Sequence, residues 1–585
     1  MLFAQKISRY WYRFIDDMRL HLSRPDALLQ LALMGVISGV LAGGVIVLFR
    51  FAVESFQDQM LPGSGSENYE ALPMWLRFTL PVAGGLILGA IFHFWSNGLH
   101  VLGIARVMER LAYHQGYLSV RGFLLQFFGA AIAIISGHSV GREGPHVYLG
   151  AAAASLFGQR LALPNNSIRT MVGCGAAAGI AASFNTPLAG VIFALEVLML
   201  EYTLASFMPI ILATVSATAI SNAVLGTDPA FEVHAMRMGS LTELPVVLIL
   251  GLLAGAAAAT FVHVLQQFAH HGKRLPIWWR TSLAGVLVGV CGAAVPEVLG
   301  IGYDTINDAL LGQIGIGLLV VLVVVKLLAT SASVGLGIPG GMIGPAFFIG
   351  ATLGSLVGIS ADRVIPGGLE SEVGYYALLG MGGMMAAALH APLAALTAMM
   401  ELTYNPGVIM PGMLVVVVAS LTASELFRKE SLFVTMLKTS GLDYKENPLL
   451  QALRRVGVAS VMNDNFEQLS QTISAERAYE VINKAPEWLL IRNEEGPSWL
   501  MPALDLVAYA KGERDGDEET IDLLAIPARR IEVEAVHLQA TLQEALETLN
   551  DSDAEALYVR RMTAPGIWHV YGVLTEDVIE AAYRP

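Results

Sequence analysis

Glu143 is an ionisable residue set between two long apolar runs of the sequence. It stands in the segment Gly141-Arg142-Glu143-Gly144-Pro145. An acid in such surroundings is a functional candidate by default, because a charge is costly to bury in an apolar medium. Glycines beside it let the backbone approach a ligand closely, and proline suits the first turn of a helix. The segment therefore predicts a helix that begins at a binding site.

The same pattern returns 200 positions later without the acid, as Gly341-Met342-Ile343-Gly344-Pro345. Two helices that begin near the membrane midplane would aim free N–H groups and positive dipole ends at one point. Such a point binds an anion without lysine or arginine, and weakly enough to release it, as conduction requires. Further identities at this offset are Gly150 and Gly350, Ala151 and Ala351, Ser155 and Ser355, Leu156 and Leu356, and Gly158 and Gly358.

A second repeated block follows the first in both halves. Residues 173–196 resemble residues 380–401, and in each block a Pro-Leu-Ala sequence is followed by a glutamate nine residues after the proline. Two blocks in the same order indicate a tandem of related halves. We expect the two glutamates, Glu196 and Glu401, to lie at helix ends, where they bond backbone amides or polar neighbours.

The composition places these elements in a membrane. Of 585 residues, 55% are hydrophobic and 14% are charged, and the mean hydropathy is +0.58. These values exclude a soluble enzyme as the main interpretation. Several apolar runs are short and interrupted by glycine or proline, which is typical of a transporter whose binding site lies at the midplane.

Charge separates the C-terminal part of the chain from the rest. Residues 446–585 hold 12 basic and 25 acidic residues, against 23 and 24 in residues 1–445. So acidic a tail argues against nucleic acid as a partner. We predict a cytoplasmic N-terminal segment at 1–27, a transmembrane domain at 28–440, and two small domains at 456–511 and 523–585.

Basic residues at both ends of the apolar region predict that the N- and C-termini are cytoplasmic, with an even number of crossings. The C-terminal pair shows short α/β patterns. We expect strands at 488–491 and 556–559, and amphipathic helices opened by Thr472 and Thr541, with an acidic linker at 511–522. This is a second internal repeat.

GREGP at 141–145 and GGMIGP at 340–345 resemble the signature elements of the CLC family of chloride channels and chloride/proton antiporters. The resemblance covers about residues 28–440, and the C-terminal pair is similar to the tandem CBS domains of many members. It implies a polytopic α-helical fold with an inverted internal repeat, followed by an α/β CBS pair. It also implies a homodimer with one pore per subunit in a bacterial inner (plasma) membrane, chloride as the ligand, no catalytic activity and no required cofactor.

The resemblance assigns roles to individual residues. Glu143 matches the gating glutamate, whose carboxylate occupies an anion position until it is protonated or displaced. Backbone amides beside it and on the second helix would bind the outer anion, and residues 102–104 and 433 would line a deeper site. The expected anion-binding residues are Leu102, Gly103, Ile104, Arg142, Gly144, Met342, Ile343 and Phe433.

Three positions depart from the family pattern. Leu102 and Phe433 stand where the family has the pore serine and tyrosine, so two hydroxyl donors are lost. Val197 stands where typical antiporters have a proton-transferring glutamate. Passive or loosely coupled chloride transport is therefore the first interpretation. A chloride/proton antiporter stays open as an alternative, and so does transport of another anion such as fluoride or nitrate.

Other residues and other protein classes have simpler explanations. We expect Lys326 to snorkel or pair at a helix end, and His146 to serve the structure rather than to tune Glu143. A CBS-bearing magnesium channel would need pore carboxylates, and a zinc protease would need HExxH, which the sequence lacks. The CBS pair often binds adenine nucleotides, but only Asp505 and Thr575 keep parts of the ribose-contacting pattern, so a structural or dimer-stabilising role is the better expectation.

Overall fold

The computed structural model describes residues 18–24, 27–62, 67–96, 103–227, 231, 236, 238–442, 448–493, 496–511, 520–552 and 554–581. The chain forms two compact units. The larger unit comprises Leu31–Gln159 and Arg169–Tyr444. The smaller unit comprises Met1–Gln30, Arg160–Ile168 and Lys445–Pro585.

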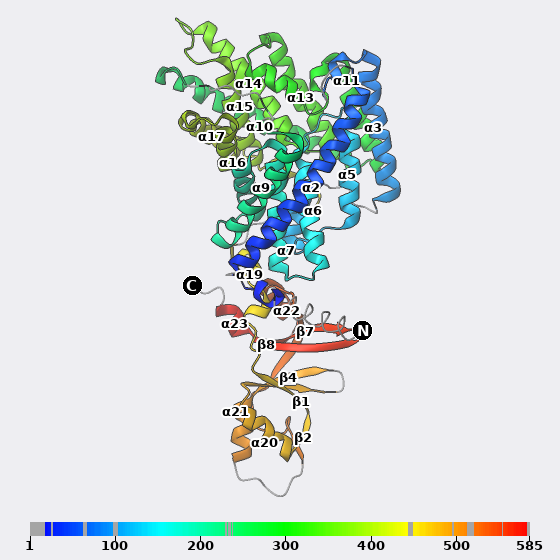
Figure 1. Ribbon diagram of the computed structural model, residues 1–585, viewed down its shortest axis with the longest axis vertical. Helices are drawn as coiled ribbons and strands as arrows, with labels where there is room; N and C mark the ends of the chain where they lie inside the picture. Colours follow the sequence, from blue (N-terminus) through cyan, green and yellow to red (C-terminus); the bar gives the residue numbers. More distant parts are fainter. Residues whose placement is uncertain are drawn as a thin grey trace. The chain divides into compact units, whose positions relative to one another are not determined.

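Helices build the larger unit (Figure 1). The first half contains α2 (Leu28–Met60), α3 (Met74–Trp95), α4 (Ile104–Tyr113), α5 (Val120–Ile135), α6 (Glu143–Arg160), α7 (Asn165–Phe184), α8 (Pro187–Phe193), η2 (Ala194–Met199) and α9 (Leu204–Leu225). The second half contains α10 (Leu244–Gly272), α11 (Ile277–Ala294), α12 (Tyr303–Leu310), α13 (Ile316–Gly335), α14 (Ile343–Val364), α15 (Val373–Leu389), α16 (Pro392–Thr403), α17 (Ile409–Leu421), η6 (Thr422–Leu426) and α18 (Leu432–Thr439).

Helix lengths confirm a polytopic membrane fold. Among the described residues, eight helices are long and apolar enough to cross a bilayer. Three further apolar segments, Val120–Ile135, Pro187–Met199 and Val373–Leu389, are shorter. Such short helices suit a membrane protein only where their ends are buried in protein, because lipid offers no hydrogen bonds to a free helix end.

Equivalent helices in the two halves pack in the same way. A Cβ added at Gly150 on α6 would lie 2.2 Å from the carbonyl oxygen of Gly175 on α7. A Cβ added at Gly350 on α14 would lie 2.4 Å from the carbonyl oxygen of Gly380 on α15. Both distances are far inside van der Waals contact, so each pair of helices requires glycine at the crossing. This shared requirement explains why glycine recurs at the same offset in both halves.

Helices α3 and α11, which are equivalent in the repeat, lie side by side (Figure 1). A Cβ added at Gly85 would lie 2.3 Å from the carbonyl oxygen of Thr281, and one added at Gly285 would lie 2.4 Å from that of Pro81. Each helix therefore presents a glycine to the backbone of the other. The contact is reciprocal, as expected where two related halves meet.

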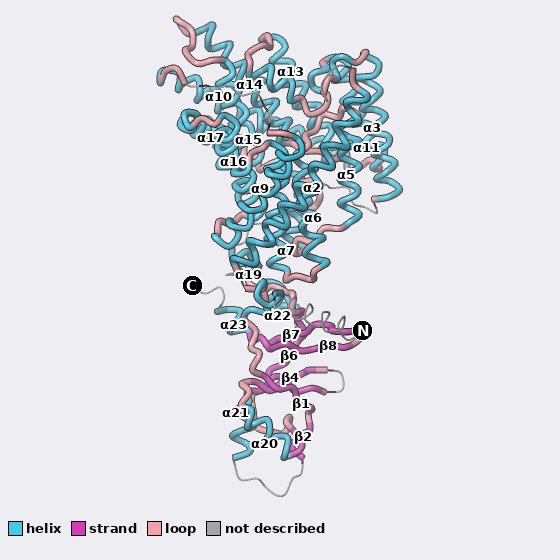
Figure 2. Tube along the Cα trace, in the orientation of Figure 1, coloured by secondary structure: helices cyan, strands magenta, loops and turns pink. Residues whose placement is uncertain are grey.

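The C-terminal part of the smaller unit carries the strands, drawn in magenta in Figure 2. A six-stranded sheet has the order β1 (Phe466–Ser470), β3 (Trp488–Arg492), β4 (Pro497–Pro502), β6 (Ile531–His537), β7 (Ala556–Ala564) and β8 (Ile567–Thr575). A smaller sheet pairs β2 (Thr472–Ser474) with β5 (Thr520–Asp522). The helices are α19 (Pro448–Arg455), α20 (Ala475–Lys484), α21 (Ala503–Lys511), α22 (Leu542–Asp551) and α23 (Glu576–Ala581).

Two copies of a β-α-β-β-α unit make up this region. In each copy the first two strands of the large sheet are parallel and the next pair is antiparallel. The predicted strands at 488–491 and 556–559 are β3 and β7, so both are confirmed. Part of the predicted acidic linker, residues 512–519, lies outside the described residues, and its end forms β5.

The two predicted helix starts have different outcomes. Thr541 caps α22 in a capping box with Glu544, as the sequence indicated. Thr472 does not begin a helix, because it lies in β2, where Ile473 is buried and pairs with Ile521. Helix α20 begins directly after this strand, at Ala475, and Ser474 caps it by accepting a bond from the N–H of Arg477.

The segment Arg160–Ile168, which contains the loop between α6 and α7, belongs to the smaller unit. The N–H of Asn165 donates to the carbonyl oxygen of Gln539 at 3.0 Å. Its side-chain amide donates to both carboxylate oxygens of Glu544, at 2.9 and 3.0 Å. Glu544 therefore joins the start of α22 to the start of α7.

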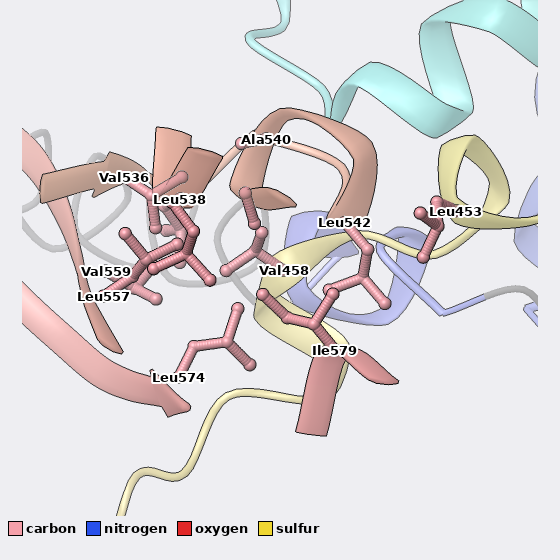
Figure 3. Packing of buried hydrophobic residues seen from close by; sticks show 12 residues of the cluster. Leu453, Val458, Val536, Leu538, Ala540, Leu542, Leu557, Val559, Leu574 and Ile579 are labelled. Atoms are coloured by element: carbon pink, nitrogen blue, oxygen red, sulfur yellow. The ribbon is translucent and has the colours of Figure 1, made fainter. Parts of the chain in front are cut away.

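An apolar core packs one side of the second β-α-β-β-α copy (Figure 3). Side chains from β6, β7, β8, α22 and α23 converge there, including Leu557 and Leu574, and Leu453 of α19 joins them.

We predict that Leu557→Ala loosens this core. Leu557 is fully buried, so removing its side chain should cost about 2–5 kcal/mol of folding free energy through lost contacts and a residual cavity. Limited proteolysis of the full-length protein in detergent measures the effect as faster cleavage within the smaller unit. Leu504→Ala serves as the control, since Leu504 is 77% exposed in the same unit. Equal cleavage rates for both variants would contradict the assigned core.

Candidate anion-binding site

The two repeated glycine segments meet each other directly. The N–H of Gly141 donates to the carbonyl oxygen of Gly341 at 2.9 Å, and the N–H of Gly341 donates to that of Gly141 at 2.6 Å. These bonds form an isolated antiparallel bridge. Helices α6 and α14 begin two residues after their respective glycines, so the bridge brings both helix N-termini to one place. The two segments run antiparallel where they meet, in agreement with an inverted repeat.

The carboxylate of Glu143 lies between these two N-termini. Its side chain is fully buried. A Cβ added at Gly141 would lie 2.0 Å from Oε2, one at Gly341 2.7 Å from Oε2, and one at Gly344 2.8 Å from Oε1. Three glycines thus leave the space that the carboxylate fills. Positive helix ends stabilise a negative charge at this point.

Tyr303 also contacts the carboxylate. Its hydroxyl donates to Oε1 of Glu143 at 2.7 Å, in a buried bond. The other carboxylate oxygen, Oε2, has no hydrogen-bond partner among the described residues. Sequence reasoning missed Tyr303. The available signal was its place as the first residue of a short helix after the glycine-rich run at 300–302.

The ring of Tyr303 is held from two sides. The guanidinium of Arg142 lies 4.8 Å from its centroid, and the ring of Phe231 packs edge-on at 4.9 Å. Phe184 and Phe347 complete an aromatic cluster around Phe231. These contacts fix the direction in which the hydroxyl points.

Lys326 secures the loop that leads into Tyr303. Its ammonium is fully buried and donates to the carbonyl oxygens of Val298, Gly300 and Ile301 at 3.1, 3.1 and 3.2 Å. Val298 ends the short helix η4 (Pro296–Val298). Pairing at a helix end is therefore confirmed for Lys326, whereas snorkelling is not, because its head group lies in the protein interior.

Acidic groups surround the loop between α2 and α3 near the start of α12. Glu67 accepts a bond from the N–H of Tyr303 at 2.9 Å. Burial, followed by repulsion from Asp304, Glu297 and other carboxylates, raises the pKa of Glu70 to about 7. This loop therefore becomes less negative as the pH falls through neutrality.

The other expected anion ligands fall into two groups. Met342 precedes α14, Ile343 begins it, and Gly144 is the second residue of α6, so the outer group lies together around Glu143. At the deeper position Ile104 begins α4, but the N–H of Gly103 donates to Oε1 of Gln126 at 2.8 Å. That amide is engaged by a side chain, which differs from its expected role.

Two further members of the deeper group can be compared with expectation. Phe433 is buried at the start of α18 and packs edge-on against Phe193, with 6.3 Å between ring centroids. It therefore offers an aromatic edge and no hydroxyl. Leu102 lies outside the described residues.

Glu196 and Glu401 cap each other's halves. Glu196 accepts bonds from the N–H groups of Leu393 and Ala394, at 3.0 and 2.8 Å, at the start of α16. Glu401 accepts bonds from those of Leu188 and Ala189, at 2.9 and 2.7 Å, at the start of α8. The expected helix-end role is confirmed, and each glutamate serves the opposite repeat.

Val197, the position expected to have lost a proton-transfer acid, is buried in η2. A small apolar pocket lies among α7, α8, α14, α15 and α16. It touches Phe193 at one side and Ile343 and Phe347 of α14 at another. None of the described residues that line it is titratable.

His146 stands one turn along α6 from Glu143 and serves the structure. Its Nδ1 shares a short hydrogen bond with the hydroxyl of Ser183, and its ring packs edge-on against Phe49. Both contacts join α6 to neighbouring helices, as expected for a structural histidine.

In the smaller unit, Asp505 and Thr575 occupy related places in the two copies. Asp505 lies in the first turn of α21, and Thr575 ends β8 just before α23. A small pocket in this unit is lined by other residues, among them Arg19, Gln539 and Arg561.

The fold is that of a membrane protein with two related halves. Helix N-termini from both halves meet inside it, an arrangement that suits the binding of an anion. The model of the voltage-gated chloride channel family matches residues 84–424, and the chain belongs to this family. A curated relative, the voltage-gated ClC-type chloride channel ClcB of Citrobacter koseri, is 30% identical over 410 residues, which cover 68% of this chain and 97% of the relative.

Two solved structures share the fold. One is the crystal structure of a slow cyanobacterial chloride/proton antiporter, with a TM-score of 0.62 and 22% identity over 70% of this chain and 97% of that one. The other is a eukaryotic CLC transporter, with a TM-score of 0.61 and 19% identity over 94% of this chain and 98% of that one. The second likeness extends over the C-terminal sheets.

We predict that Glu196→Ala and Glu401→Ala each destabilise the helical unit. Either change leaves two helix N–H groups without their carboxylate, and the loss of a cap costs about 0.5–2 kcal/mol. Thermal denaturation in detergent measures this as a lower melting temperature. Glu425→Ala, at an exposed glutamate of η6, is the control. Unchanged melting of both capping variants would show that these bonds contribute nothing.

We also predict that Gly344→Ala displaces the Glu143 carboxylate. The atoms nearest to the added Cβ belong to that flexible carboxylate, so it yields while the backbone stays in place. Chloride efflux from liposomes should therefore rise several-fold at neutral pH. Gly317→Ala is the control, because nothing lies within 4 Å of an added Cβ there. A flux equal to the control's would contradict the position of the carboxylate.

Proposed function

We propose that this member of the family carries chloride through a pore whose outer end is closed by Glu143, with passive or loosely proton-coupled transport. The family transports small anions across membranes. The observation that carries the gating role is the position of the buried carboxylate, between the N-termini of α6 and α14. A negative group held by two helix ends occupies the place that suits a halide.

Gating follows from competition for this place. The ionised carboxylate and a chloride ion carry the same charge, and both are stabilised by the same helix ends. Protonation removes the charge of the carboxylate, so the helix ends then favour the anion. Because Tyr303 donates to Oε1, the closed position is also held by a hydrogen bond.

Weak coupling follows from the groups on the inner side of the gate. Val197 has no proton to give, and Glu196 beside it uses both carboxylate oxygens as helix caps. The described lining of the cavity between Phe193 and Ile343 offers no titratable group. Protons that reach Glu143 from inside would need water, which an apolar cavity holds poorly. A chloride/proton antiporter is the alternative, in which such water is present.

Selectivity depends on the deeper position. With phenylalanine at 433 and the amide of Gly103 bonded to Gln126, fewer donors remain there for an anion. Discrimination between anions depends on such donors, because hydrogen bonds from the protein must replace those that the anion loses when it sheds water. Fluoride and nitrate are therefore tested beside chloride as transported ions.

We further propose that the protein is a homodimer with both termini in the cytoplasm, in a bacterial inner membrane. Exposed apolar side chains on α8 and α16, such as Leu188 and Leu393, support a lipid- or subunit-facing surface beside the Glu196 and Glu401 caps. The duplicated β-α-β-β-α region supports a CBS pair. Adenine nucleotide remains a candidate ligand there, through Asp505 and Thr575.

The reversal potential of the purified protein in liposomes tests this function. Under a chloride gradient we predict a potential set by chloride, with little or no shift when a proton gradient is added. Glu143→Gln should leave or increase anion flux and remove any remaining pH dependence, because an amide cannot be ionised. His146→Gln is the matched control on the same helix.

Two results would overturn parts of this proposal. A reversal potential that moves with the proton gradient in a fixed ratio would establish the antiporter alternative. Loss of pH sensitivity in the His146 variant alone would remove the gating role from Glu143.

A further inference from the structure

We propose that Tyr303 is itself a ligand of the transported anion at the outer position. When the carboxylate of Glu143 leaves, the anion that replaces Oε1 accepts the hydrogen bond of the phenolic hydroxyl. This inference rests on the proposed transport function and adds a residue to the site. The carboxylate oxygen seen here stands in for the anion, because both are buried, negative acceptors at the same pair of helix ends.

The contact between Tyr303 and Glu143 is buried, short and held in place by neighbouring side chains. Glu143 is fully buried and Tyr303 is 7% exposed, with 2.7 Å between the hydroxyl oxygen and Oε1. The ring has little freedom, since Arg142 covers one side and Phe231 packs against it. A hydroxyl fixed in this way keeps pointing to the same spot after the carboxylate has gone.

Energetics favour an anion at that spot. A buried hydroxyl that loses its acceptor costs free energy, because no water replaces the bond. A negative acceptor forms a stronger hydrogen bond than a neutral one. A halide that enters the position therefore accepts the hydrogen bond of the Tyr303 hydroxyl, whereas an empty position would leave that hydroxyl without an acceptor.

The positive charges of Arg142 and Lys326 also favour an anion beside the Tyr303 hydroxyl. The guanidinium over the ring draws electron density from the phenol, which makes its O–H a better donor. The buried ammonium of Lys326 adds positive charge behind the loop of Tyr303. Glu67 and Asp304 oppose this field, and Glu67 already accepts the backbone N–H of Tyr303.

The deeper position offers few hydrogen-bond donors for an anion. Phe433 has no hydroxyl, and the N–H of Gly103 is engaged by Gln126. A hydroxyl donor stands instead at the outer position, on a helix that belongs to the second repeat. Tyr303 would thus supply at the gate the kind of contact that the deeper position lacks.

Chloride binding by isothermal titration to four purified proteins tests this. They are the wild type, Tyr303→Phe, Glu143→Ala and the double variant. In the Glu143→Ala background we expect Tyr303→Phe to weaken chloride binding about tenfold, the loss of one hydrogen bond to a charged acceptor. In the wild-type background the change should be much smaller, because the carboxylate and chloride both lose the same donor.

Other outcomes of this cycle would overturn the proposal. An equal loss in both backgrounds would mark Tyr303 as a structural residue. No loss in the Glu143→Ala background would mark it as a latch on the carboxylate alone. Tyr375→Phe is the control, because this buried tyrosine has no hydrogen-bond partner for its hydroxyl among the described residues.

A failure of the proposed function is recognisable separately. If Glu143→Ala with an intact Tyr303 binds no chloride, the outer position is not an anion site, and the function itself fails. If Tyr303→Phe does not fold, crystals of Glu143→Ala grown in bromide answer the same question. Anomalous density within hydrogen-bond distance of the Tyr303 hydroxyl supports the proposal, and bromide bound elsewhere in the pore overturns it.

Discussion

The helical unit must stabilise a buried carboxylate, that of Glu143, to which no lysine or arginine is bonded among the described residues. Among the described residues, the side chain that bonds the carboxylate of Glu143 is Tyr303. The positive N-terminal ends of α6 and α14 further stabilise its charge. Helices must therefore end inside the membrane protein rather than at its surface. The bridge between Gly141 and Gly341 fixes these ends together, and the surrounding helices protect them from lipid.

Both halves of the repeat contribute helix ends to the protein interior. Each half contributes one broken helix to the site, and each also contributes a glutamate that caps a helix of the other half. Glycines at equivalent positions allow the same close helix crossings twice, as at Gly150 and Gly350. Reciprocal contacts of this kind couple the two halves, because separating them would leave a helix end of each half without its carboxylate cap.

Most of the membrane fold and the centre of the site could be predicted from the sequence. The offset of 200 residues between the glycine segments fixed the pairing of α6 with α14, and the spacing of Glu196 and Glu401 indicated helix caps. The role of Tyr303 could not be found in this way, because it contacts Glu143 across 160 residues of sequence through a loop held by Lys326. The engagement of Gly103 by Gln126 is likewise a tertiary contact, invisible to local spacing. The prediction of a helix start at Thr472 was wrong because threonine is common both as a helix cap and in short strands.

In the proposed function, the Glu143 carboxylate occupies an anion site built by two helix ends. Equilibrium dialysis with radioactive chloride tests it most directly, by comparing the number of ions bound per chain in the wild type and in Glu143→Ala at neutral pH. We expect one additional chloride in the variant, because the carboxylate no longer fills the position. Equal numbers in the two proteins would contradict it.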